Sequence, residues 1–171
     1  TWATAHEDDK AAVKRLWEWI YSCKGNPTKF LNEYAEYFGN DSPFAWYLIT
    51  DYFMAVDNRA KNMMLVTWDG KIWYFIPYDM DTVFGERNDS VLKYDYTITW
   101  ETMDESIGSY AFAGHDSVLW ELVRGCPDKL REVADKLRST MSLEYVLKVF
   151  NEEMMGNWCE RIYNKDGIYK Y

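Results

Sequence analysis

The chain has 171 residues, 48% of them hydrophobic and 27% charged, a composition typical of one globular domain with a proper core. Its 28 acidic residues outnumber its 19 basic residues, and the net charge of −9 makes it a poor candidate for binding a nucleic-acid backbone. No run of about 18 apolar residues is present, so the sequence predicts no membrane span.

The cysteines are few and far apart. Cys23, Cys126 and Cys159 form no CxxC pair, which favours free thiols in a reducing intracellular compartment over a zinc site or a disulfide framework. The sequence begins at Thr1 without an initiator Met or a signal-peptide pattern. We therefore expect it to be part of a longer protein.

Residues 6–56 are predicted to be helical. An apolar stripe at helical spacing indicates a helix over residues 11–23. Pro27 predicts the start of a second helix, which Gly39 ends. A third helix is expected over residues 44–56, and because it is apolar nearly all round we expect it to be central and buried.

Residues 57–85 have a sequence pattern typical of β-strands, in contrast to the helical pattern before them. Two apolar runs at residues 63–68 and 71–76 read as β-strands. Asp69-Gly70 lies between them, a dipeptide typical of a two-residue hairpin turn. This segment therefore predicts a loop followed by a β-hairpin.

Residues 86–115 are polar and irregular, with a short strand expected over residues 93–100, and a long loop of this kind is usually functional or mobile. Residues 116–163 are predicted to be helical again. The expected helices span residues 118–124, 128–139 and 142–157. The prediction is thus a single α+β module, mainly α, over residues 1–171.

Polar residues flank the predicted hairpin on both sides. Asp57 is followed five residues later by Asn62, and Asp79 and Asp81 come directly after the second strand. Because hairpin strands are antiparallel, we expect the two groups to meet. Hard cations such as Mg²⁺ prefer oxygen ligands of this kind. An Asp-x4-Asn loop, a hairpin and a further Asp is also the order of parts in the catalytic half of a protein kinase.

In this interpretation each residue has a role in phosphoryl transfer. Asp57 accepts the proton of the acceptor hydroxyl or orients it. Arg59 or Lys61 neutralises the charge that develops on the transferred phosphoryl group. The predicted ligands of the cation and its nucleotide are Asn62, Asp79 and Asp81.

Simpler explanations exist for the same residues. An Asp-x4-Asn spacing occurs by chance in many chains, and Asp57 can be an ordinary loop residue. Asp79 and Asp81 can cap a turn by accepting hydrogen bonds from backbone N–H groups. The same pair is also suited to a structural Ca²⁺ that binds without a nucleotide.

The segment over residues 57–85 resembles the CotH kinase family of atypical protein kinases. In that family a loop with an Asp and a downstream Asn precedes a hairpin, whose second strand ends in Pro-aromatic-Asp-x-Asp, here Pro77-Tyr78-Asp79-Met80-Asp81. The family's usual aromatic residue is Trp, and its loop often carries a His that this chain lacks. The resemblance implies the C-terminal lobe of a kinase fold, with Asp57 as the catalytic Asp. It also implies ATP with Mg²⁺ or Mn²⁺, bound by Asn62 and Asp79.

The sequence contains no Gly-rich loop and no Val-Ala-x-Lys strand before its helices. We expect these parts of a kinase in an amino-terminal lobe elsewhere in the parent polypeptide. Runs at residues 59–63, 116–120 and 162–166 are similar to CotH-like segments of large bacteriophage virion proteins, which implies a virion as an alternative location and virion subunits as alternative partners.

Three functions follow as hypotheses. The first is an active kinase that transfers a phosphoryl group from Mg-ATP to a protein hydroxyl. The second is a catalytically silent structural module of a phage virion or tail. The third is a carbohydrate- or surface-binding module that uses aromatic residues of the polar loop, namely Tyr94, Tyr96, Trp100 and Tyr110. The presence of Asp57, Asn62 and Asp79 together favours a cation site.

Overall fold

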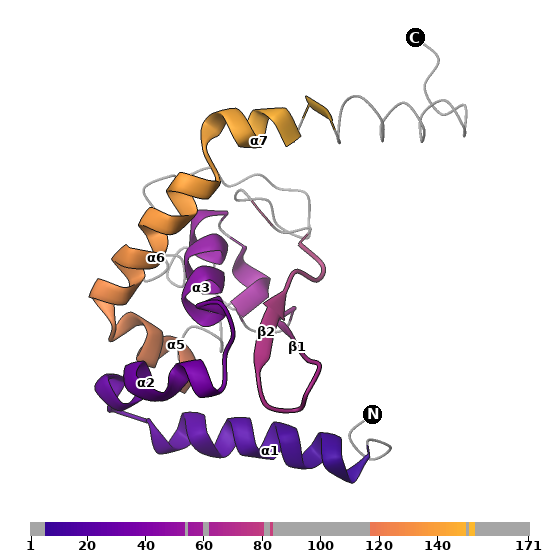
Figure 1. The fold of residues 1–171 in the computed structure, drawn as a ribbon, viewed down its shortest axis with the longest axis vertical. Helices are drawn as coiled ribbons and strands as arrows, with labels where there is room; N and C mark the ends of the chain where they lie inside the picture. Colours follow the sequence, from indigo (N-terminus) through magenta and orange to yellow (C-terminus); the bar gives the residue numbers. More distant parts are fainter. Residues whose placement is uncertain are drawn as a thin grey trace. The chain divides into compact units, whose positions relative to one another are not determined.

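The computed structural model describes residues 6–53, 55–59, 62–80, 83, 117–149 and 151–152, with only the backbone of Val56 and Asp57 (Figure 1). The chain divides into two compact units, residues 1–133 and residues 134–171. The predicted strand over residues 93–100, together with Lys61 and Asp81, lies outside the described residues.

Most of the described residues are helical, and one small sheet is present among them, so the predicted α+β, mainly α, class is confirmed. The first unit contains α1 (Glu7–Ser22), α2 (Pro27–Glu33), η2 (Tyr34–Glu36), α3 (Ser42–Tyr52), η3 (Val56–Arg59), β1 (Met64–Thr67), β2 (Trp73–Ile76) and α5 (Val118–Arg124). Helix α6 (Pro127–Thr140) begins in the first unit and ends in the second, which also contains α7 (Leu143–Val149). None of the described helices is long and apolar enough to cross a membrane.

Side-chain caps mark the starts of two helices. The side chain of Asn26 accepts a hydrogen bond from the backbone N–H of Lys29 at 3.0 Å, and Pro27 occupies the first turn of α2. Ser117 caps α5 in the same way, through the backbone N–H of Trp120 at 3.3 Å. Local side-chain chemistry therefore sets where these helices begin.

The end of α3 differs from the prediction. The helix stops at Tyr52, and a separate 3₁₀ turn, η3, takes up residues 56–59, which were expected as helix end and open loop. The hydroxyl of Thr50 donates to the carbonyl oxygens of Trp46 and Tyr47, a bond within the helix that weakens its regular ladder. The helix is also less buried than expected, because Tyr52 is 80% exposed.

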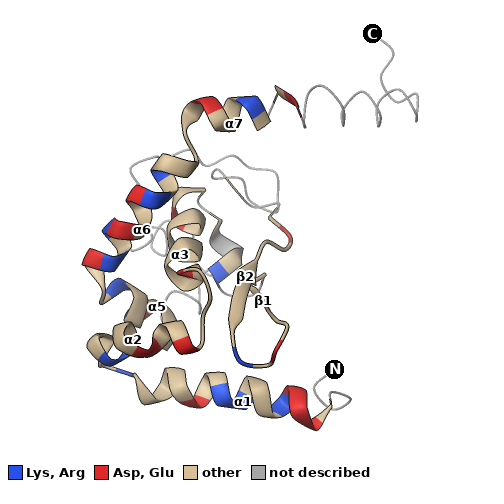
Figure 2. Ribbon diagram, viewed as in Figure 1, with Lys and Arg blue, Asp and Glu red and all other residues tan. Residues whose placement is uncertain are grey.

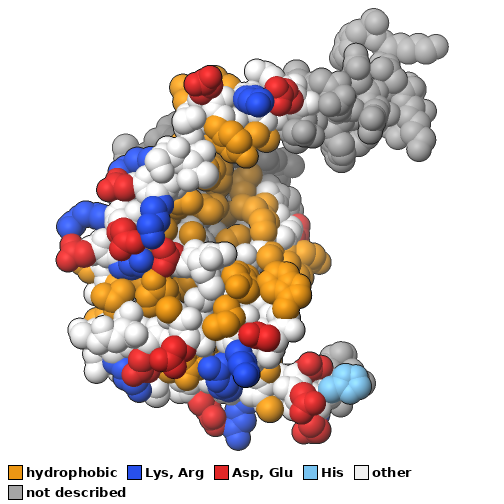
Figure 3. All heavy atoms as spheres, in the orientation of Figure 1, with side chains coloured by type: hydrophobic (Ala, Val, Ile, Leu, Met, Phe, Trp, Pro, Cys, Tyr) orange, Lys and Arg blue, Asp and Glu red, His pale blue; other side chains and the backbone are white. Residues whose placement is uncertain are grey.

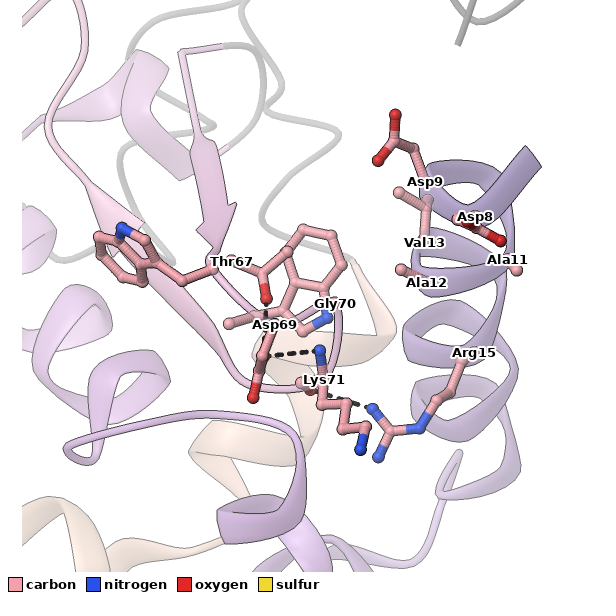
Figure 4. Close-up of a pocket in the computed structure, with 12 residues that line it drawn as sticks. Asp8, Asp9, Ala11, Ala12, Val13, Arg15, Thr67, Asp69, Gly70 and Lys71 are labelled. Carbon is pink, nitrogen blue, oxygen red and sulfur yellow. Dashed lines mark hydrogen bonds between the residues drawn. The ribbon is translucent and has the colours of Figure 1, made fainter. Parts of the chain in front are cut away.

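The predicted hairpin forms, but the prediction of a two-residue turn is wrong. Thr67 pairs with Trp73, so residues 68–72 all belong to the connection. The carboxylate of Asp69 accepts hydrogen bonds from the backbone N–H of Lys71 at 2.8 Å and from the Thr67 hydroxyl at 3.1 Å (Figure 4). It also accepts one from the backbone N–H of Ile72 at 2.9 Å. These bonds stabilise a wider loop than the Asp-Gly pair alone predicts.

Aromatic side chains join the hairpin to the helices. The ring of Phe75 in β2 lies 5.8 Å from those of Phe38 and Trp46 and 5.6 Å from that of Trp120. Trp73 pairs with Phe38 across an isolated parallel bridge. Figure 3 shows apolar side chains gathered over the middle of one face. The sheet is therefore fixed on an aromatic core.

Gly39 allows this close approach. Its backbone N–H donates to the carbonyl oxygen of Trp73 at 3.1 Å, which brings the chain beneath the ring of Tyr74. A Cβ atom at this position would lie 2.3 Å from that ring. A side chain larger than hydrogen would therefore require the ring of Tyr74 to move.

Charged side chains on α1 and α6 are mixed in sign (Figure 2). Helix α6 carries ion pairs at i,i+3 spacing, Arg131 with Asp128 and Arg138 with Asp135. Lys129 also reaches Asp41 at the start of α3, at 3.1 Å. Burial opposes the charge on Lys129, but contacts with Glu132, Asp41 and Tyr34 outweigh it and raise its pKa.

The hairpin connection should respond to acid through Asp69. The N–H groups of Ile72 and Lys71 lower the pKa of this carboxyl from its usual 3.8. A lowered folded-state pKa stabilises the fold above 3.8, and this contribution is lost as the pH falls through the folded-state pKa. We therefore expect Asp69→Asn to unfold at lower urea concentration than wild type at pH 7, with a smaller difference at pH 3. Glu18→Gln, which removes only an exposed pair with Lys14, is the control. An equal difference at both pH values would contradict the prediction.

Candidate functional site

The hairpin brings the two predicted halves of the site to the same end. Asn62 lies just before β1, Asp79 lies just after β2, and the terminal pair Met64–Ile76 closes that end of the sheet. The side-chain Nδ2 of Asn62 donates to the backbone carbonyl oxygen of Asp79 at 3.2 Å. Two residues that are seventeen positions apart are thus in direct contact.

This contact does not use the side-chain oxygen atoms of Asn62 and Asp79 that could ligate a cation. It uses the amide nitrogen of Asn62, whereas a hard cation would be ligated by the amide oxygen. The side chain of Asp79 is exposed. Its backbone has φ +50°, in the left-handed region that residues other than Gly rarely adopt. Such conformations cluster at functional sites, where the surrounding structure imposes them.

Asn58 is a site residue that the sequence analysis missed. It is fully buried, and its Nδ2 donates to the carbonyl oxygen of Tyr78 at 2.8 Å and to that of Asn62 at 3.3 Å. It therefore joins η3 to both segments that flank the hairpin. The only sequence signal was a polar residue directly after Asp57, which local patterns do not distinguish from an ordinary loop residue.

Two indole groups fix the backbone of η3. The Nε1 of Trp46 in α3 donates to the carbonyl oxygen of Asn58 at 3.0 Å. The Nε1 of Trp120 in α5 donates to the carbonyl oxygen of Arg59, also at 3.0 Å. Both indoles are buried, so a turn that would be weak alone is held from two helices.

Arg59 is buried in the core, with 1% of its surface exposed. Its guanidinium donates to the carbonyl oxygen of Tyr47 at 2.6 Å and to the Thr50 hydroxyl at 2.9 Å, and it lies 3.8 Å from the centre of the Tyr47 ring. Burial lowers the pKa of Arg59 to about 10, so it remains charged at neutral pH. The catalytic role predicted for Arg59 does not fit this placement, because the guanidinium is buried and hydrogen-bonded to Tyr47 and Thr50 of α3.

The remaining predicted residues are described only in part. Asp57 lies in η3, and only its backbone is described, whereas Lys61 and Asp81 lie outside the described residues. Within the described part of the chain, no three His, Cys, Asp or Glu side chains form a group that could hold a metal ion. The described part of the candidate site therefore consists of Asn58, Asn62 and Asp79.

A surface pocket lies at the opposite end of the hairpin, between its connection and α1 (Figure 4). Arg15 lies at its edge and donates to the carbonyl oxygen of Lys71 at 3.0 Å. The pocket is next to the Thr67–Trp73 pair, whereas Asn62 and Asp79 lie beyond the Met64–Ile76 pair. It shares no lining residue with the candidate site.

Comparison with known families shows which family this chain belongs to. The family model described as CotH kinase protein matches residues 3–165, nearly the whole chain. The chain belongs to the CotH kinase family. The match includes both flanks of the hairpin, so the CotH-like, kinase-related nature of the module is shown. No curated protein and no solved structure matches the chain at a significant level.

The structural role of Arg59 in this CotH family member can be measured. We expect Arg59→Met to lower the free energy of unfolding by about 2–3 kcal/mol, because it removes a charged donor from buried acceptors. Arg59→Lys should lower it too, since a lysine cannot reproduce the forked geometry. Chemical denaturation provides the measurement, and Arg131→Met, at an exposed ion pair, is the control with a change within about 0.5 kcal/mol. Unchanged stability of Arg59→Met would contradict the core role.

Proposed function

We propose that this CotH family module binds ATP with Mg²⁺ or Mn²⁺ at the junction of η3 and the hairpin, and transfers a phosphoryl group to a protein hydroxyl. The observation that carries the proposal is the hydrogen bond from Asn62 to the backbone of Asp79. It joins the two sequence-distant segments in which the family pattern has its loop Asn and its metal-binding Asp.

The chemistry of the donor set fits a hard cation. Asn62 contributes an amide oxygen and Asp79 an exposed carboxylate, which are the ligand types that Mg²⁺ takes in small number together with water and phosphate. In addition, Asp81 follows Asp79 closely enough in sequence to contribute a second carboxylate. A cation held there by Asn62 and Asp79 would supply positive charge that offsets the negative charge of the nucleotide phosphates during transfer.

The other residues are assigned by their position on the loop. Asp57, in η3, orients the acceptor hydroxyl and takes its proton. Lys61 is the remaining cationic side chain of the loop that can face the phosphoryl group, since Arg59 is bound within the core. We further propose that the rest of the parent polypeptide provides the lobe that covers the nucleotide.

The hairpin offers a matched pair of variants. Asp79→Asn removes a carboxylate charge at the site end, and Asp69→Asn makes the same change at the connection end. With the natural polypeptide that contains these residues, we expect Asp79→Asn to weaken Mn²⁺-ATP binding by more than about 100-fold and to abolish transfer of labelled phosphate to protein. We expect Asp69→Asn to change neither.

The outcomes separate the competing functions. If the wild-type protein binds no nucleotide with Mg²⁺ or Mn²⁺, the kinase proposal fails and a silent structural module is favoured. If Ca²⁺ binds without nucleotide and Mg²⁺ competes poorly, the site is a structural calcium site. Equal loss in Asp79→Asn and Asp69→Asn would mean that the effect arises from the hairpin fold and not from a ligand.

A further inference from the structure

Asn58 is fully buried, yet the two polar atoms of its side chain differ in their contacts. The Nδ2 atom donates two hydrogen bonds, to the carbonyl oxygens of Tyr78 and Asn62. The Oδ1 atom is buried and has no hydrogen-bond partner among the residues that the structure describes. Because both neighbours of Nδ2 are carbonyl acceptors, only the NH₂ group can face them, and the orientation of the amide is chemically determined.

This orientation has an energetic cost. A buried amide oxygen without a partner has lost its hydrogen bonds to water and gained nothing in return. An apolar side chain of similar size, such as leucine, would avoid that loss. The need for an amide at this position is therefore better explained by its two donated bonds than by packing.

The two donated bonds act together with a third. Asn58 bonds the carbonyl oxygen of Tyr78, and Asn62 bonds the next carbonyl oxygen, that of Asp79. The peptide units on both sides of the Asp79 Cα atom are thereby anchored. Fixing both peptide planes fixes the φ and ψ angles between them, including the φ of +50° at Asp79. The Asn58–Asn62 bond ties the two amide-bearing segments to each other.

We infer that Asn58 is a positioning residue of the cation site: it holds the backbone of Asp79 in the left-handed conformation and so aims its carboxylate, without being a ligand itself. The role in cation binding rests on the proposed function. The effect on the Asp79 backbone rests on the hydrogen bonds alone. Residues that orient a metal ligand typically change metal affinity by about 10- to 100-fold when they are replaced.

The test uses variants that separate positioning from stability. Asn58→Leu removes both donors together with the unpaired oxygen at similar volume. Asn58→Ser retains one hydroxyl donor and serves as a second, smaller change. Trp19→Phe is the matched control, because it removes the hydrogen bond of a buried indole, to the Glu33 carboxylate, and leaves η3 and the bonds to Tyr78 and Asp79 intact.

The first measurement needs no ligand. In wild type and in Trp19→Phe, we expect NMR order parameters of the Asp79 and Met80 amides near the rigid value of about 0.85, and in Asn58→Leu below about 0.6. The second measurement is Mn²⁺ affinity from water proton relaxation. We expect a loss of about 10- to 100-fold in Asn58→Leu, a smaller loss in Asn58→Ser and none in Trp19→Phe.

Each outcome tests one part of the inference: the backbone effect, the positioning role or the proposed cation site. Unchanged order parameters in Asn58→Leu overturn the backbone effect. Lower order parameters with unchanged Mn²⁺ affinity overturn the positioning role. A wild-type chain that binds no Mn²⁺ overturns the proposed function and the cation part of the inference, whereas the order parameters still decide whether Asn58 holds the Asp79 backbone.

Discussion

The geometry around the candidate site depends on two indole hydrogen bonds, from Trp46 and Trp120 to the carbonyl oxygens of Asn58 and Arg59. A 3₁₀ turn of four residues has little stability of its own. Here the carbonyl groups of Asn58 and Arg59 accept hydrogen bonds from buried indoles on two different helices. These bonds fix the turn as part of the core.

Arg59 reinforces the same arrangement from its side chain. Its guanidinium contacts Tyr47 and Thr50 of α3, while its carbonyl oxygen is held by α5. One residue therefore connects α3, η3 and α5. In this protein Asn58 and Arg59 of the loop that the CotH family pattern associates with catalysis are buried against the aromatic core.

Much of this could be predicted from the sequence, because the deciding signals were local. Pro27 with Asn26, and Ser117, mark helix starts through bonds within one turn. The hairpin was predictable from two apolar runs, and antiparallel pairing then required Asn62 and Asp79 to approach each other. The width of the connection was not predictable, because it depends on three simultaneous bonds to the Asp69 carboxylate.

The roles of Asn58 and Arg59 could not be predicted for a different reason. A polar or charged residue in a short loop normally faces water. Only the three-dimensional structure shows that these two side chains turn inward, toward partners such as Tyr47 and Tyr78, which lie 12 and 20 positions away in the chain. The sequence contains both partners but no signal that pairs them.

The separation of the two hairpin ends has a consequence for finding relatives of this protein. The connection at residues 68–72 closes through its own hydrogen bonds and takes no part in the bonds that join Asn62 to Asp79. Its length can therefore drift during evolution while the far end keeps its geometry. A search pattern with a fixed spacing between the loop Asn and the strand-end Asp would miss homologues with longer or shorter hairpins. The two halves of the motif are better searched separately, with a gap of variable length between them.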